Sequence, residues 1–490
     1  MASFRVSLAY SYLNKYVTLV ILFGTSIIMA RLLTPADIGI YTVAAVFVGL
    51  GHLLREFGIN QYIVQEKDLT PDRIRAAFTL NLLFGWSIAL ILYFARTPIG
   101  NFYNSEGIRE VIGLLCINFL LVPIGAITFA YIRREMRFNH TMVIQVASTF
   151  VSAVVGISAA LAGEAYRSLV WSAIAGTLTS VIFTLVYRPP GMLLLPGLRE
   201  IPHVFAFCRY AGPSDLIIHA GQTAPDWILG KILDVSAVGL YSRALGTINI
   251  FSKAFMEALW GVVLPHFSKQ HREGTIDRDQ YLFLVDCLTA VAWPFFATLA
   301  VLAEPVIRIL FGEQWMESVP VLRILCLSAI LSYTTALVDQ VMRSSGRVRN
   351  SFRIILGTQL LAVIAVLLAA QYGLAWVAVA TTSVSMVQFC IYQIVGQRML
   401  NIRFIEFARV YGKNMLITGA ALTPSLAAML IWGNAPFALL LNMAALVVVT
   451  GLAWMVAIWL LKSPLLGELV VVLSHIKTWC RAGASSGPTR

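Results

Sequence analysis

The sequence has 490 residues, of which 59% are hydrophobic and only 12% are charged, and its mean hydropathy is +0.79. A soluble globular chain is nearer half apolar and a quarter charged, so this composition excludes a soluble fold and indicates a polytopic helical membrane protein. The formal net charge of +12 does not indicate a nucleic-acid partner, because the basic residues are spread between apolar runs instead of forming one patch.

Apolar runs of about 20 residues, enough to cross a bilayer, predict an all-α architecture of about fourteen transmembrane helices. A Pro- and Gly-rich interval over 188–207 marks a cytoplasmic linker. We therefore predict an N-terminal six-helix lobe over 1–187, a pseudo-symmetric C-terminal six-helix lobe over 208–396, two additional helices over 397–461 and a cytoplasmic tail over 462–490. The expected spans lie near 10–30, 39–63, 76–95, 108–131, 139–162, 166–187, 208–232, 239–265, 281–303, 318–342, 350–371, 373–396, 414–432 and 436–461.

A repeated segment relates the two predicted lobes. Residues 30–44 recur 200 positions later, with Gly39 matching Gly239 and Tyr41 matching Tyr241. We interpret each copy as the outside connection between the first two helices of a lobe, in which the glycines permit a close turn and the tyrosines anchor at the membrane interface. Each predicted lobe has an even number of spans, so we expect an axis along the membrane normal with a substrate path between the lobes.

The basic residues predict the orientation of the chain. Of the 36 Lys and Arg residues, 25 fall in one alternate set of connections and only six in the other, with five inside spans. Cytoplasmic connections carry the excess of Lys and Arg. Both termini are therefore expected to be cytoplasmic, and the N-terminal apolar run is expected to be a retained first span, since it is too long for a signal peptide.

Cations inside the predicted spans are candidates for substrate contact, because intramembrane charges usually face a bundle interior or an aqueous cavity. Of the five, we take four as candidates, Lys15, Arg55, Arg243 and Lys253, and leave out Arg323. His52 and Glu56 are spaced to pair with each other, which leaves Arg55 without an obvious local partner. A guanidinium forms a planar fork that suits phosphate, so Arg55 is the strongest candidate for an anion contact. For Lys253, an ion pair with Glu257 remains the alternative.

Acidic residues inside the second predicted lobe are candidates for ion or proton coupling. Asp215, His219 and Asp226 follow one another at helical spacing on one face, and Asp339 ends a similar polar stripe. A carboxylate cannot remain ionised against lipid, so each must be paired, hydrated or protonated. Hydrogen bonding between helices is the alternative for all these polar stripes, and a structural histidine is the alternative for His219.

The sequence contains no recognisable active site. It has no phosphate-binding loop of the G-x-x-x-x-G-K-[ST] kind, no dinucleotide fingerprint and no metal-binding set of His and Cys residues. The predicted outside connections are short and contain no convincing acid/base pair. We therefore predict a protein without cofactor or metal that is not an enzyme.

Five motifs in the expected order resemble the polysaccharide transporter (Wzx-type) family of the multidrug/oligosaccharidyl-lipid/polysaccharide flippase superfamily. They cover most of the first twelve predicted helices, and the third looks most like the branch that handles exopolysaccharide repeat units. The five segments are Arg31–Tyr41, Arg55–Gly58, Tyr131–Phe138, Val238–Tyr241 and Glu304–Gly312.

The resemblance implies a V-shaped pair of six-helix lobes that open alternately to the two sides of the membrane. It implies a cargo of oligosaccharide repeat units on undecaprenyl diphosphate, moved across the bacterial inner membrane for exopolysaccharide or lipopolysaccharide biosynthesis. It also implies a central cavity with basic residues for the diphosphate and sugar acids. The matching positions here are Lys15, Arg55, Arg243 and Lys253.

A flippase of lipid-linked oligosaccharides, driven by an ion gradient, is the function that these patterns favour. A polysaccharide polymerase and a chain-length regulator are its expected protein partners, and no nucleic acid is expected. The first alternative is a related exporter of small cationic drugs, in which Asp215, Asp226 and Asp339 would bind the cargo. A polysaccharide polymerase or ligase, and a non-transporting scaffold, are less favoured alternatives.

Overall fold

The computed structural model contains only helices, turns and loops among the residues it describes. Twelve helices in this part of the chain are long and apolar enough to cross a membrane, which confirms an all-α polytopic membrane protein. The other two expected spans, 208–232 and 239–265, are only partly described. The described residues are all except 1, 57, 191, 193–194, 212–218, 257–266, 268–277, 434–439 and 468–490.

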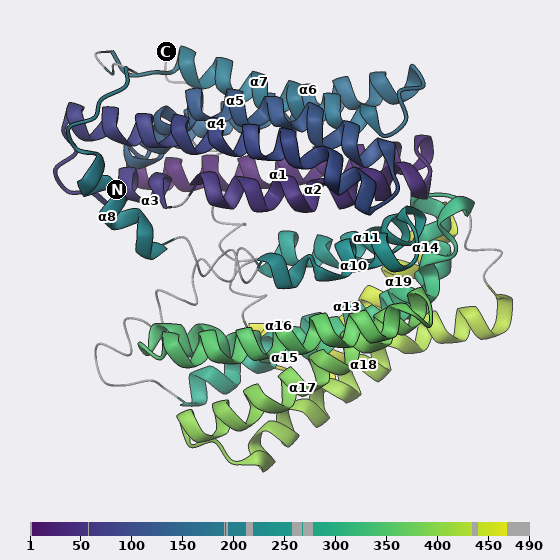
Figure 1. Ribbon diagram of the computed structural model, residues 1–490. Coiled ribbons are helices and arrows are strands. Elements are labelled where there is room, and N and C mark those ends of the chain that lie inside the picture. The colour runs from purple at the N-terminus through teal and green to yellow at the C-terminus, as the bar shows by residue number, and fades with distance from the viewer. Residues whose placement is uncertain are drawn as a thin grey trace, which may run out of the picture. The chain divides into compact units, whose positions relative to one another are not determined.

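The chain forms two compact units. The first comprises residues 1–246, 311–315 and 355–377, and the second comprises 247–310, 316–354 and the residues from 378 onward. The first unit thus contains the opening helices of the expected C-terminal lobe, and the lobe boundaries stay a prediction. Its helices are α1 (Ala2–Leu32), α2 (Pro35–Glu56), α3 (Ile59–Gln65), α4 (Pro71–Phe102), α5 (Glu106–Arg134), α6 (Phe138–Leu161), α7 (Arg167–Val186), α8 (Ile201–Ala211), α10 (Ala224–Ile232), most of α11 (Val235–Phe251) and most of α16 (Val348–Ala370) (Figure 1).

The second unit is built on α13, α15, α18 and α19, which pack pairwise. Trp293 donates to the Thr334 hydroxyl (2.9 Å), and Trp454 donates to the carbonyl of Ala290 (2.8 Å). Hydroxyl pairs join further helices, for example Ser328 with Ser385 at 2.7 Å. The elements are a π-helical turn (Ser252–Met256), α13 (Arg278–Val301), α14 (Ala303–Leu310), α15 (Ser318–Ser344), α17 (Leu374–Leu400), α18 (Phe404–Trp432) and α19 (Leu440–Leu460); a 3-10 turn (Glu313–Trp315) lies in the part assigned to the first unit.

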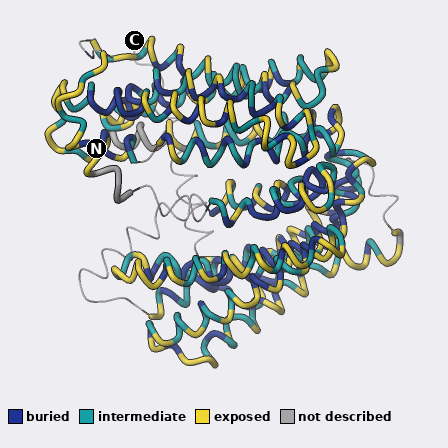
Figure 2. Tube along the Cα trace, in the orientation of Figure 1, coloured by how far each residue is buried: buried dark blue, intermediate teal, exposed yellow. Residues whose placement is uncertain are grey.

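Many large apolar side chains lie on the outside of both units. Buried and exposed positions recur along the long helices (Figure 2), and exposed apolar residues include Phe94, Val186 and Leu430. In water such surfaces would cause association, whereas lipid is their natural solvent. The protein is therefore a multi-pass membrane protein.

The repeated segment forms helix starts, not turns. Thr34 caps α2 by accepting from the Asp37 N–H (3.2 Å), and Pro35 occupies the first helical position. In the second copy Asp234 accepts from the Ala237 N–H (2.7 Å). The expectation that Gly39 permits a close turn is wrong, because α2 already begins at Pro35 and Gly39 lies inside this helix.

The matched glycines and tyrosines serve packing. A Cβ at Gly39 would lie 1.6 Å from the carbonyl oxygen of Val235, and a Cβ at Gly239 would lie 2.0 Å from that of Pro35. Glycine is thus required for the close approach of two helix starts. The expected interface anchor is also wrong for Tyr241, which is completely buried.

The second expected span is interrupted. Gly58 has φ of 80°, in the left-handed region that favours glycine, and it separates α2 from the short α3. A buried apolar cluster around Tyr62, Ile63 and Ile127 holds α3 against α5. The interruption lies just after Arg55 and Glu56, which are the last two residues of α2.

The described residues of the predicted linker over 188–207 belong to the first unit, and some of them pack against α4. Thr79 of α4 accepts from the Gly197 N–H (2.8 Å), and its hydroxyl lies 2.9 Å from the Gly197 carbonyl. Arg75 donates to the carbonyls of Leu195 and Pro196. Helix α8 begins at Ile201, so the last part of the expected linker is helical.

Candidate substrate-binding site

Arg55 is buried at the end of α2, with only 6% of its surface exposed. Its Nη1 donates to Oδ1 of Asn81 on α4 at 3.0 Å, and Asn81 is itself 1% exposed. The Nε of Arg55 is buried and has no hydrogen-bond partner among the described residues. A guanidinium carries five N–H donors, so this side chain retains unused donors in a dry position.

The local sequence explains why Arg55 is left with unused donors. The expected pairing of His52 with Glu56 is wrong, because His52 stacks on Phe119 (ring centroids 4.4 Å apart) and Glu56 accepts from Asn60 (2.8 Å). Neither neighbour therefore forms an ion pair with Arg55 among the described residues. That Arg55 lacks a local ionic partner stays a prediction.

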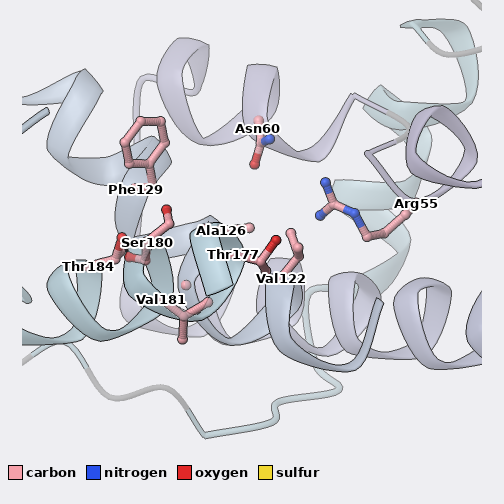
Figure 3. A pocket seen from close by; sticks show the side chains of 11 residues that line it. Arg55, Asn60, Val122, Ala126, Phe129, Thr177, Ser180, Val181 and Thr184 are labelled. Atoms are coloured by element: carbon pink, nitrogen blue, oxygen red, sulfur yellow. Dashed lines mark hydrogen bonds between the residues drawn. The ribbon is translucent and has the colours of Figure 1, made fainter. Parts of the chain in front are cut away.

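Arg55 lines a cavity of about 360 Å³ inside the first unit. Figure 3 shows its guanidinium directed toward the middle of the cavity, where Val122, Ala126 and Thr177 lie. Gly125 and Gly176 also line the cavity. The remaining lining residues are Asn60, Phe129, Ser180, Val181 and Thr184.

A hydroxyl face of α7 forms one wall of this cavity. Thr177, Ser180 and Thr184 are separated by three and four positions, which places them on one side of a helix. The Thr184 hydroxyl donates a hydrogen bond to the carbonyl of Ser180 (2.6 Å). The cavity thus combines one fixed positive charge, several hydroxyls and apolar surface, which fits an anionic group attached to a polar, partly apolar molecule.

Arg243, the third predicted cavity cation, is held by aromatic and polar contacts. Its guanidinium carbon lies 4.7 Å from the ring centre of Phe311 and 4.8 Å from that of Trp315. Its Nη1 donates to Ser26 at 2.8 Å. Trp315, which is fully buried, donates to the carbonyl of Ala30 (2.8 Å). These contacts connect α11 with the end of α1 and the Phe311–Trp315 segment.

The other two predicted cations lie in different units, Lys15 in the first and Lys253 in the second. Lys15 is half-buried on α1 and does not line the Arg55 cavity. Lys253 is exposed on the π-helical turn after α11. Glu257, the expected partner of Lys253, lies outside the described residues.

The acidic candidates have different surroundings. Asp215 lies outside the described residues, and His219 packs closely against Gly49 of α2. Asp226, on α10, has a buried Oδ1 without a hydrogen-bond partner among the described residues. Asp339 is ion-paired with Arg343 (2.8 Å) and accepts from Tyr392 (3.4 Å) and Ser351.

The second unit contains a buried charge cluster that was not predicted from the sequence. Asp286 of α13 pairs with Lys413 and accepts from Asn414 (2.9 Å). Lys413 was assigned to a connection because the expected span began at residue 414, but α18 begins at Phe404. A single carboxylate in an otherwise apolar run was the only signal for Asp286.

The described residues thus form a multi-pass helical membrane protein in which a buried cation lines a cavity. A model of the family described as polysaccharide biosynthesis protein matches residues 28–320. The chain belongs to this family.

Two relatives extend the likeness over most of the chain. The teichuronic acid biosynthesis protein TuaB of Bacillus subtilis is 24% identical, covering 75% of this chain and 77% of its own. The lipopolysaccharide biosynthesis protein WzxC of Escherichia coli is 22% identical, covering 66% of this chain and 67% of its own. The predicted resemblance to Wzx-type proteins is confirmed.

Two solved structures share the fold. The lipid II flippase MurJ, in an inward closed conformation, is 11% identical with a TM-score of 0.68, covering 95% of this chain and 99% of its own. A multidrug resistance MATE family transporter of the MOP superfamily is 13% identical with a TM-score of 0.64, covering 78% of this chain and 94% of its own. The superfamily fold predicted from the sequence is thus confirmed.

Proposed function

We propose that the protein is a flippase for oligosaccharide repeat units linked to undecaprenyl diphosphate. The observation that carries the proposal is Arg55, a buried guanidinium with an unpartnered Nε at a cavity with a hydroxyl face. Membership of the polysaccharide biosynthesis family and the fold shared with a lipid II flippase support the same cargo class.

Physical chemistry explains why such a cargo needs this kind of site. A diphosphate-sugar headgroup is too polar to cross hydrocarbon unaided, because burial of a charge without compensation is very costly. A protein cavity offers the headgroup a cation and hydroxyl partners, while the prenyl tail stays in lipid. The guanidinium fork matches phosphate or carboxylate oxygens and forms charge-assisted hydrogen bonds.

The proposal extends to the membrane, the orientation and the driving force. We place the protein in the bacterial inner membrane with both termini in the cytoplasm, as the distribution of Lys and Arg predicts. An ion gradient supplies the energy, and the cargo passes to a polymerase and a chain-length regulator on the far side. Transport, rather than catalysis, is the activity.

Deletion of the gene tests the direction of the proposed step. We expect lipid-linked repeat units to accumulate in the cytoplasmic leaflet of the deletion strain, and complementation with the intact chain to restore surface polysaccharide. Accumulation of repeat units that have crossed but remain unpolymerised would instead indicate a polymerase.

Export of small cations is the second candidate, and Asp226 favours it. Its buried, unpartnered Oδ1 offers an acceptor to a cationic molecule, and a MATE transporter shares the fold. If this candidate holds, Asp226→Asn abolishes resistance to lipophilic cationic dyes in cells that express the protein. If the flippase proposal holds, expression confers no such resistance in the first place.

A further inference from the structure

A second cavity, of about 260 Å³, lies in the second unit where α15 ends, α16 begins and α17 ends. Two arginines line it: Arg347 precedes α16, and Arg353 lies in the first part of that helix. Asn350, between them in the sequence, adds an amide. The cavity thus combines two guanidinium groups with an apolar floor. The apolar lining residues are Met342, Ile354 and Val395.

The single carboxylate of these three helices is engaged with other partners. Asp339 is the only acidic residue in the sequences of α15, α16 and α17. Its Oδ2 accepts from Nε of Arg343 at 2.8 Å, and its Oδ1 accepts from Ser351 of α16 and from Tyr392 of α17 (3.4 Å). These hydrogen bonds join the three helices beside the cavity. They also leave Asp339 with no oxygen for the arginines that line it.

Positive charge is therefore in excess around the cavity. The side chains of Arg347 and Arg353 are exposed and form no ion pair with a described residue. Arg398 adds a further exposed cation at the end of α17, three positions beyond Val395 and so on the same side of that helix. An anion that entered the cavity would meet two guanidinium groups without displacing a carboxylate.

The surroundings of the cavity match a lipid better than a soluble anion. Helices α15, α16 and α17 are each long and apolar enough to cross a membrane, so their ends lie at the depth of the lipid headgroups. Val387, Ile391 and Val395 follow one another at steps of four and form one face of α17. Val395 lines the cavity, and Val387 is 42% exposed. An apolar strip thus leads from the cavity toward the middle of the span.

We propose that this cavity binds the headgroup of an anionic phospholipid. Arg347 and Arg353 hold the phosphate diester through charge-assisted hydrogen bonds, to which the guanidinium fork is suited. One acyl chain lies along the Val387–Val395 strip of α17. Basic pockets between transmembrane helices on the cytoplasmic side bind such headgroups, and the distribution of Lys and Arg predicts that this end is cytoplasmic.

Orientation of the chain during insertion does not by itself explain these arginines. A cation that only sets the topology needs to lie near the end of a span, as exposed Arg409 of α18 does. Arg347 and Arg353 instead line one hollow with an apolar floor. A lipid bound there stabilises the folded second unit, because a ligand that binds only the folded state shifts the unfolding equilibrium.

Titration of the purified, delipidated full-length chain with phosphatidylglycerol or phosphatidylcholine of the same acyl chains tests the proposal, with bound lipid counted by native mass spectrometry. The intact chain is expected to bind phosphatidylglycerol about tenfold more tightly or better, as the loss or gain of a charge-assisted hydrogen bond implies. Phosphatidylglycerol, but not phosphatidylcholine, should also raise its melting temperature.

Arg353→Gln removes one cation from the cavity and is expected to weaken phosphatidylglycerol binding about tenfold. Arg409→Gln is the matched control, because it removes one exposed arginine from the same unit without touching the cavity. Both variants should melt like the intact chain in detergent alone, since both side chains are exposed. Equal weakening in the two variants, or no preference for phosphatidylglycerol in the intact chain, would overturn the proposal.

Two competitors identify the occupant. Glycerol 3-phosphate, which has the charged headgroup without acyl chains, should not displace phosphatidylglycerol; displacement would assign the cavity to a soluble anion. A prenyl diphosphate that binds more tightly than phosphatidylglycerol, and loses this binding in Arg353→Gln, would assign the cavity to the cargo instead. None of these measurements requires transport, so their outcome does not depend on whether the protein flips oligosaccharides.

Discussion

Gly39 and Gly239 make reciprocal contacts at the starts of α2 and α11. Each glycine faces the first helical residue of the other segment, Val235 for Gly39 and Pro35 for Gly239. The two contacts are exchanged by a shift of 200 positions in the sequence, as in the self-complementary contact of a two-fold axis. The two copies of the sequence repeat are therefore in contact with each other in the structure.

A methyl group at this crossing is expected to destabilise the protein. In Gly39→Ala the new Cβ meets a backbone carbonyl, which cannot move aside as a flexible side chain would. Overpacking of this kind costs about 1–3 kcal/mol, which thermal unfolding of the purified chain in detergent measures. Gly24→Ala is the control, because nothing lies within 4 Å of a Cβ at that position of α1. Equal melting temperatures for the two variants would contradict the close contact.

We expect Arg243 to contribute mainly to the stability of the fold. Arg243→Ala removes the contacts with Phe311 and Trp315 and the hydrogen bond to Ser26. A desolvated cation–π contact contributes about 2 kcal/mol, so the melting temperature should fall clearly. Arg243→Lys keeps the charge but not the planar stacking, and should recover only part of the loss. An unchanged melting temperature in Arg243→Ala would show that these contacts do not stabilise the fold.

The docked linker yields a third prediction. Thr79→Val keeps the shape of the side chain but removes both contacts with the backbone of Gly197. The part-buried Gly197 amide then loses its partner, which costs up to about 1–3 kcal/mol. Limited proteolysis should cut the 188–207 segment faster in this variant. Thr179→Val is the control, because among the described residues the Thr179 hydroxyl bonds only within its own helix, to the carbonyl of Ala175. Identical digestion of both variants would show that the linker is not held by Thr79.

We expect Glu66, which follows the end of α3, to contribute to stability in a pH-dependent way. Partial burial raises the pKa of this carboxyl, but the hydrogen bonds from His203 and the Asp68 N–H and the charge of Arg73 outweigh it, so the pKa lies below its usual 4.5. A depressed pKa stabilises the fold above the unfolded value, and this stabilisation is lost as the pH falls through the folded value. Glu66→Gln should therefore melt lower than the intact chain at neutral pH, and the difference should vanish in acid below pH 4.5. A constant difference at all pH values would be the contrary outcome.

The sequence predicted the features that depend on neighbours along the chain. Apolar run lengths predicted the membrane helices, and the position of Arg55 inside an apolar run singled out a residue that lines the cavity. The start of α2 was also predictable, because Thr34 and Asp37 at cap spacing with Pro35 between them indicate a helix start. Hydropathy alone placed that start later, at residue 39.

Contacts between distant segments could not be predicted in the same way. Asn81 as the partner of Arg55, and Phe311 and Trp315 as the partners of Arg243, depend on packing that no local spacing reveals. The Asp286–Lys413 pair was not predicted, because the first part of α18 is polar and a hydropathy window therefore does not assign Lys413 to a span. The capping pair of Arg403 with Glu406 marks the true beginning of α18.

The most direct test of the central proposal is a flipping assay with the purified chain in liposomes that contain a fluorescent prenyl-diphosphate-linked oligosaccharide. The intact chain should move the lipid between leaflets, and protein-free liposomes should not. Arg55→Ala should slow the movement about tenfold or more, as expected when a charge-assisted hydrogen bond of about 1.5–3 kcal/mol is lost. Arg409→Ala, which removes an exposed cation from α18, should not. An intact chain that moves no lipid, or an Arg55→Ala variant as fast as the intact chain, would contradict the proposal.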